Sequence, residues 1–146
     1  MKAPDDLLEP VHCVSNNLQK TARAVSRLFA EEMRPSGLTR AQFPMLGYLE
    51  AAGPLPMSDL AARLYMERTT LTRNLRLLED AGLVERPPDP QDARVRLVAI
   101  TPLGRRKLRE ARRYWRRAQE RVLKLYGAEQ WLALESQLRT LRRLVQ

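Results

Sequence analysis

The chain has 146 residues and a formal net charge of +9, with 26 Lys and Arg against 17 Asp and Glu. A chain of this length folds as one compact unit and buries enough surface to need no disulfide. The only cysteine is Cys13 and the only histidine is His12, which excludes a disulfide framework and a multi-thiolate zinc site and fits a reducing cytosol. With no apolar run near the roughly 20 residues of a membrane span and no secretory signal, we expect a cytoplasmic protein.

The basic residues are unevenly distributed. Twenty-two of the 26 are arginines, whose planar fork pairs with phosphate and guanine. Nearly the whole excess lies between Arg105 and Lys124, either as a solvated helix face or as a field that draws the protein toward a polyanion. The chain carries no glycine-rich phosphate loop, metal-ligand cluster or nucleophile–base pair, so we expect no enzyme, no cofactor and no metal site.

Two helices are predicted first. Residues 11–34 carry an apolar stripe of alternating four- and three-residue spacing and end at a Pro-Ser-Gly turn. A second helix is predicted from Thr39, as the N-cap, to Ala52, with Pro44 bending it.

A helix-turn-helix is predicted next. Residues 58–65 form a short helix capped by Ser58, and a brief turn leads to a longer helix over 68–81 that ends at Gly82. The buried face of this longer helix is marked by Leu71, Leu75 and Leu78. Two helices joined by so short a turn are typical of DNA-binding proteins.

A β-hairpin follows at once. Residues 83–86 are extended, the proline-rich segment 87–92 forms a loop, and residues 94–100 are rich in β-branched side chains. A hairpin directly after a helix-turn-helix is the order of a winged helix. The fold class is therefore mainly α with a small β-hairpin wing.

The carboxyl-terminal part is predicted to form two long helices. The first is capped by Thr101-Pro102 and runs to about Tyr126, and the second covers about 128–145. Both carry seven-residue apolar stripes, as the first helix does. We expect residues 1–36 and 102–146 to form a helical dimerisation region around a winged helix-turn-helix over 37–101. A two-fold dimer is the default, and an intramolecular bundle in a monomer is the alternative.

Several short motifs, in this order and spacing, are similar to those of the MarR (multiple antibiotic resistance regulator) family of bacterial transcription factors. They are LTRAQF at 38–43, SDLA at 58–61, RTTLTR at 68–73, LEDAGLV at 78–84, DAR at 92–94 and ITPLG at 100–104. The resemblance covers nearly the whole chain. It implies a winged-helix homodimer that binds a pseudo-palindromic operator in double-stranded DNA, usually as a repressor, and a cleft that takes small, often aromatic or phenolic, effectors.

The amino-terminal turns of the 68–81 helix would lie in the major groove. Threonine hydroxyls contact bases or phosphates, Arg73 could pair with guanine in a bidentate manner, and Arg76 reaches phosphate. In the wing, the resemblance implies that Arg94 enters the minor groove and that Asp92 orients it, with Arg96 as a further contact. The predicted DNA-binding residues are Arg68, Thr69, Thr70, Thr72, Arg73, Arg76, Arg94 and Arg96.

The effector cannot be named from the sequence. Residues on the segments that line the family's cleft are Cys13, Asn17, Phe43, Leu46, Tyr65, Met66, Arg113 and Tyr114. An aromatic wall with an arginine suits an anionic aromatic effector. Ordinary packing is the alternative for each of them.

Two alternatives to a ligand-released repressor stay open. In one, Cys13 senses peroxides, as one cysteine near this end of the first helix does in a MarR subgroup. Asn17, Arg40 and Phe43 stand where that subgroup has the tyrosines that activate the thiol. In the other, the chain is a winged-helix protein-interaction module without specific DNA binding.

Overall fold

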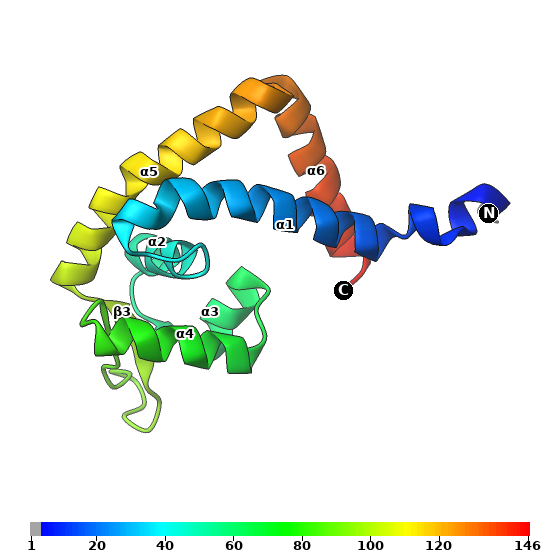
Figure 1. The fold of residues 1–146 in the computed structure, drawn as a ribbon. Coiled ribbons are helices and arrows are strands. Elements are labelled where there is room, and N and C mark those ends of the chain that lie inside the picture. Colours follow the sequence, from blue (N-terminus) through cyan, green and yellow to red (C-terminus); the bar gives the residue numbers. More distant parts are fainter. Residues whose placement is uncertain (1–3) are drawn as a thin grey trace.

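The computed structural model describes residues 4–146. It is mainly helical with a small antiparallel sheet, as predicted (Figure 1). The helices are α1 (Val14–Met33), α2 (Gln42–Ala52), α3 (Met57–Leu64), α4 (Arg68–Asp80), α5 (Pro102–Tyr126) and α6 (Ala128–Leu144). The strands are β1 (Leu55–Pro56), β2 (Val84–Glu85) and β3 (Leu97–Ile100), and short 3-10 turns cover Asp5–Leu8, Pro10–His12 and Arg34–Ser36.

The winged helix-turn-helix forms one layer of the molecule, and α1 packs against α5 above it (Figure 1). Its core contains fully buried side chains of α2, α3, α4 and β3, and α5 adds Leu108 and Ala111. The core leucines of α4 are Leu71, Leu75 and Leu78, as the spacing predicts. Burial of these side chains fixes which face of α4 remains free, because apolar area removed from water stabilises at about 25 cal/mol per Å².

The sheet has one strand more than the sequence predicts. Its order is β1-β3-β2, and β3 pairs antiparallel with both neighbours, with Leu55 opposite Val98 and Val84 opposite Ile100. A two-residue strand that ends in Pro56 has too little pattern to be recognised from sequence. The wing strand begins at Leu97 rather than Arg94, and all four residues of β3 are buried.

Of the three predicted helix starts, the one at Thr101 is confirmed. Helix α2 begins at Gln42 after Ala41 rather than directly after Thr39, and α3 begins at Met57. Thr39 and Gln42 exchange the two hydrogen bonds of a capping box. The backbone N–H of Gln42 donates to Thr39 Oγ1 (3.2 Å), and the backbone N–H of Thr39 donates to Gln42 Oε1 (3.0 Å). Ser58 is wrong as an N-cap, because α3 starts at Met57 after Pro56 and has no side-chain cap. Pro44 lies in the first turn of α2, where the amide of a helix has no partner within the helix, so no bend is required.

Thr101 joins the start of α5 to the end of α4. Its hydroxyl oxygen accepts from the Gly104 amide (3.0 Å), and the hydroxyl donates to the carbonyl of Gly82 (2.6 Å). Gly104 must be glycine, because a Cβ there would collide with the carbonyl oxygen of Leu83. The predicted cap is confirmed.

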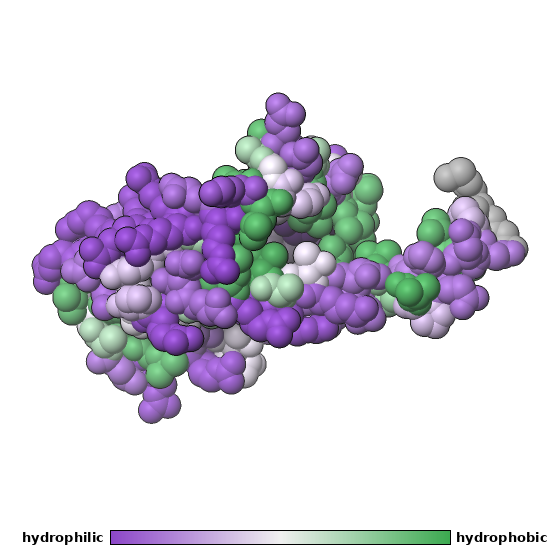
Figure 2. Space-filling model, turned by 45° about the horizontal axis from the view of Figure 1, so that its top comes forward, coloured by the Kyte–Doolittle hydropathy of each residue, from purple (hydrophilic) through white to green (hydrophobic). Residues whose placement is uncertain are grey.

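The amino-terminal part of the chain and α6 leave apolar side chains uncovered. Val14, Leu18 and Val25 of the predicted α1 stripe are exposed, and every residue of α6 is at least partly exposed. Figure 2 shows apolar side chains gathered near α6, whereas the side of the molecule that α5 forms is hydrophilic. No helix in the described part of the chain has the length and apolarity to cross a membrane.

Candidate nucleic-acid interface

One face of α4 is buried and the opposite face is free. The three core leucines anchor one side of the helix, while Thr69, Arg73 and Arg76 are exposed. At 100° per residue these three side chains project opposite the leucine stripe. The helix therefore presents a hydroxyl and two guanidinium groups to solvent, which is the chemistry that reads base edges and phosphates.

The other predicted residues of α4 differ in how free they are. Arg68 is exposed at the first position of the helix. The Thr72 hydroxyl donates to the carbonyl of Arg68 (2.8 Å), so its proton is engaged within the helix. Thr70 is half-buried, and its carbonyl accepts from the Asn74 side chain (2.9 Å). Among the three threonines, Thr69 and Thr72 are exposed, and Thr72 offers its methyl group and oxygen lone pairs rather than its proton.

The wing holds an arginine in a fixed position at its tip. Arg94 Nε and Nη2 donate to the two carboxylate oxygens of Asp92 at 3.0 and 3.1 Å, and the Arg94 amide also donates to this carboxylate (3.1 Å). These hydrogen bonds lower the pKa of Asp92 and raise the pKa of Arg94. The pair is thus ionised at neutral pH, while the side chain of Arg94 remains 91% exposed.

A hollow of about 900 Å³ lies between α3, the start of α4 and the wing. Arg68, Arg94 and Arg96 line it, so the structure brings together predicted residues from the helix and from the wing. A fourth arginine, Arg86, lines it as well and was not predicted. Alternation along β2 could have indicated it, because Val84 points inward, Glu85 outward and Arg86 inward again.

Arg86 is incompletely satisfied within the described part of the chain. Its Nη1 donates to the sulfur of Met57 (3.5 Å), a weak acceptor, and its buried Nε has no partner there. The carbonyl of Arg86 accepts from Arg96 Nη1 (3.4 Å). A half-buried guanidinium without a strong acceptor favours an incoming anion such as a phosphate.

The structure distributes the eight predicted effector residues over several places. Leu46 is fully buried in the core, and Phe43 stacks on Trp115 with ring centroids 5.8 Å apart. Tyr65 and Met66 line the hollow beside the wing, whereas Arg113 lies over the ring of Tyr114 on α5 (4.6 Å to the centroid). Leu46 therefore packs in the core, and the other residues are not gathered at one site.

Cys13 and Asn17 lie at the amino-terminal end of α1. Cys13 is exposed. The Asn17 side chain donates to the backbone carbonyls of Val11 (3.1 Å) and Cys13 (2.9 Å). Asn17 thus secures the entry into α1 through the backbone, and the two residues lie on an exposed stretch of helix.

Comparison with known proteins gives one consistent result. The model of the MarR family matches residues 36–95. The multiple antibiotic resistance protein MarR of Escherichia coli is 32% identical over 104 residues, which are 71% of this chain and 72% of that protein. The residues that the family model matches include α2, β1, α3, α4 and β2.

Solved structures are similar over most of the chain. The Mycobacterium tuberculosis transcriptional regulator MosR in complex with DNA has a TM-score of 0.81 at 34% identity, covering 91% of this chain and 96% of that one. The transcriptional repressor CouR bound to a 23-mer DNA duplex has a TM-score of 0.83 at 27% identity, covering 97% and 99%.

Proposed function

Because this chain belongs to the MarR family of transcriptional regulators, we propose that it binds a pseudo-palindromic operator as a homodimer and represses the genes downstream. It is a regulator and not an enzyme. Helix α4 lies in the major groove, and the wing reaches the adjacent minor groove. The observation that carries this proposal is the free face of α4, where Thr69, Arg73 and Arg76 stand opposite the buried leucines.

The two contact regions have different roles. Arg73 lies near the centre of the free face of α4 and pairs with a guanine edge. Arg94 enters a narrow minor groove, whose negative potential attracts a guanidinium that Asp92 already orients. Arg68, Arg86 and Arg96 surround the hollow between these two contacts, where a backbone phosphate would lie, and they set affinity rather than sequence.

The uncovered apolar side chains support the dimer. The exposed residues at the two ends of the chain are Leu7, Leu8, Val11, Val14, Leu132, Leu144 and Val145. Large exposed apolar patches commonly mark protein interfaces. A second copy covers these segments and places the two α4 helices about one helical turn of DNA apart, roughly 10 bp.

Two experiments test the proposal. Footprinting on the DNA upstream of the gene should protect two half-sites related by a two-fold axis, and binding should weaken steeply with salt. Sedimentation should give a dimer at micromolar concentration. Absence of sequence-selective binding would favour the interaction-module alternative, and a lone subunit would overturn the two-fold arrangement.

We also propose that a small effector releases the protein from its operator. The family's cleft lies between the helical region and the winged helix, and the structure has hollows on that side of α2, next to Phe43 and Arg40. An effector bound there acts by favouring an arrangement of the two α4 helices that does not fit the operator. Cys13, being exposed, remains the candidate for a redox signal instead.

A further inference from the structure

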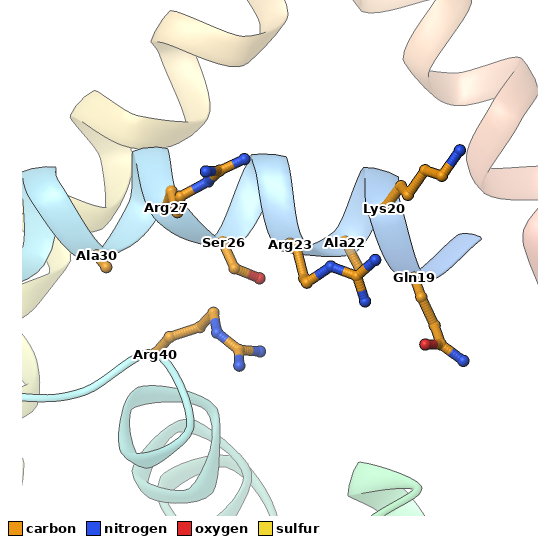
Figure 3. Close-up of a pocket in the computed structure, with 8 residues that line it drawn as sticks. All are labelled: Gln19, Lys20, Ala22, Arg23, Ser26, Arg27, Ala30 and Arg40. Carbon is orange, nitrogen blue, oxygen red and sulfur yellow. The ribbon is translucent and has the colours of Figure 1, made fainter. Parts of the chain in front are cut away.

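A basic groove lies between α1 and the start of α2, with a volume of about 730 Å³. Figure 3 shows Ser26 on α1 pointing toward Arg40, which stands just before α2, whereas Arg23 lies on the same side of α1 and extends along the helix toward Gln19. Lys20 and Arg27 line the same groove but point to the other side of α1. Two guanidinium groups, a hydroxyl and an amide from two parts of the fold thus line one groove.

The cations of this groove are not neutralised by the chain. No Asp or Glu lines the groove, and within residues 4–146 neither Arg23 nor Arg40 has an ion pair or a side-chain hydrogen bond. Arg40 also precedes the amino-terminal end of α2, where the helix dipole favours negative charge rather than positive. Two exposed arginines elsewhere pair with acids, Arg112 with Glu50 and Arg121 with Glu32.

The donor set fits a phosphate better than a carboxylate. One arginine fork can engage both oxygens of a carboxylate, whereas a phosphate monoester has three free oxygens, which can accept from more than one fork, and a charge near −2 at neutral pH. Arg23 supplies one fork from α1, Arg40 supplies a second from the segment before α2, and Ser26 supplies a further donor.

An apolar hollow of about 310 Å³ adjoins the groove, and Arg40 lines both. Its walls are Phe29, Met33, Phe43, Pro44 and Trp115, with Phe43 and Trp115 stacked on each other. A ligand held at Arg40 can therefore place an apolar group of about one ring in this hollow.

We propose that this composite site binds a small organic phosphate, a phosphate monoester with an apolar, ring-sized body. The proposal rests on the effector-released repressor described above and names the chemical class of its effector. The phosphate bridges Arg23 and Ser26 of the helical region to Arg40 of the winged helix-turn-helix. Binding thereby fixes the angle between these two parts, which sets the separation of the two α4 helices.

The test uses the full-length protein and phenyl phosphate, a monoester of this class. Binding is followed by the ³¹P signal of the ligand and by calorimetry. We expect one phenyl phosphate per chain, and at least about tenfold weaker binding of benzoate, which has the same ring but only a carboxylate. Equal binding of the two ligands overturns the assignment to phosphates, and the lack of saturable binding overturns the site.

Two double variants distinguish binding of phenyl phosphate at this site from its general attraction to the positive net charge of the protein. Arg23→Gln/Arg40→Gln should weaken phenyl phosphate binding by about tenfold or more, because charge-assisted hydrogen bonds are lost. Arg106→Gln/Arg109→Gln removes the same charge from exposed positions of α5 and should change binding by less than about twofold. An equal loss in both variants overturns the site.

The same preparations keep this inference separate from the proposed function. Arg23→Gln/Arg40→Gln leaves the α4 face and the wing intact, so we expect it to shift the operator in a gel as the unmodified protein does. Operator binding without phenyl phosphate binding refutes the ligand class alone. If the unmodified protein does not bind the operator, the proposed function as a repressor is refuted.

Discussion

Arg94 is held by a two-point hydrogen bond to Asp92 although its side chain is 91% exposed. A free arginine at a hairpin tip samples many rotamers, and ordering it on DNA costs conformational entropy. Asp92 restricts these rotamers before DNA arrives, so less entropy is lost on binding.

Removing the carboxylate tests this relationship. Asp92→Asn should weaken operator binding by roughly threefold to tenfold, with base preference unchanged, because only the preorganisation of Arg94 is lost. Because the pKa of Asp92 is lowered from 3.8, the ion pair of Asp92 and Arg94 contributes to folding stability above pH 3.8. This stability is lost as the pH falls through the lowered pKa. An NMR titration of Asp92 should show its pKa rising toward 3.8 in Arg94→Ala, and an unchanged pKa would contradict the pairing.

The helix and the wing should respond differently to truncation. Arg73→Ala should cost about 1–3 kcal/mol on the preferred operator and relax selection at one base pair. Arg94→Ala should lower affinity while the ranking of sequences in the half-site core stays the same. Binding measured against a panel of single-base operator variants separates the two effects, and an unchanged ranking and affinity in both variants would refute the interface.

A substitution at Arg86 tests whether the hollow beside the wing binds a DNA phosphate. Arg86→Met removes the buried Nε that has no partner in the described part of the chain, so the free energy of unfolding should stay the same or rise. If this arginine contacts a phosphate, the slope of log affinity against log salt should fall by about one. Arg63→Met, at an exposed position on α3, is the control and should leave the slope unchanged.

Replacing two glycines by alanine should change the free energy of unfolding in opposite directions. A Cβ at Gly104 would meet the Leu83 carbonyl, so Gly104→Ala should lower the free energy of unfolding by about 1–3 kcal/mol. At Gly47, within α2, a Cβ would meet nothing within 4 Å, so Gly47→Ala should raise it by about 0.5–1 kcal/mol. Urea denaturation of both variants checks the pair, and a loss of stability at Gly47 would contradict the packing described here.

Local patterns predicted most of this fold because they report burial along one element. The leucine spacing of α4, the Gly82 stop and the Thr101 cap all rest on interactions within a few residues or one turn. The assignment of Ser58 as a cap was wrong because the start of α3 follows from the pairing of Leu55 with β3, a long-range contact. The strand β1 is defined by the same long-range pairing, and its two residues are too few to show a pattern in the sequence.

Sequence spacing places the residues of the candidate interface together, but it does not reveal the basic groove between α1 and α2. Thr69, Arg73 and Arg76 share one helix, and Asp92 and Arg94 share one turn, so sequence spacing alone places them together. The basic groove brings Arg23 of α1 and Arg40, just before α2, to one site after a change of chain direction, and only the three-dimensional structure reveals it. Leu46 follows the periodicity of a core residue as well as that of a cleft wall, and the structure places it in the core.

The Thr101 hydroxyl makes hydrogen bonds both to the first turn of α5 and to the segment that ends α4. These two helices therefore move together as one rigid unit. With 25 residues in α5, the arm is about 37 Å long. A tilt of only about 5° at the distant end, where α6 begins, would therefore displace α4 by about 3 Å, roughly the rise of one base pair in the duplex.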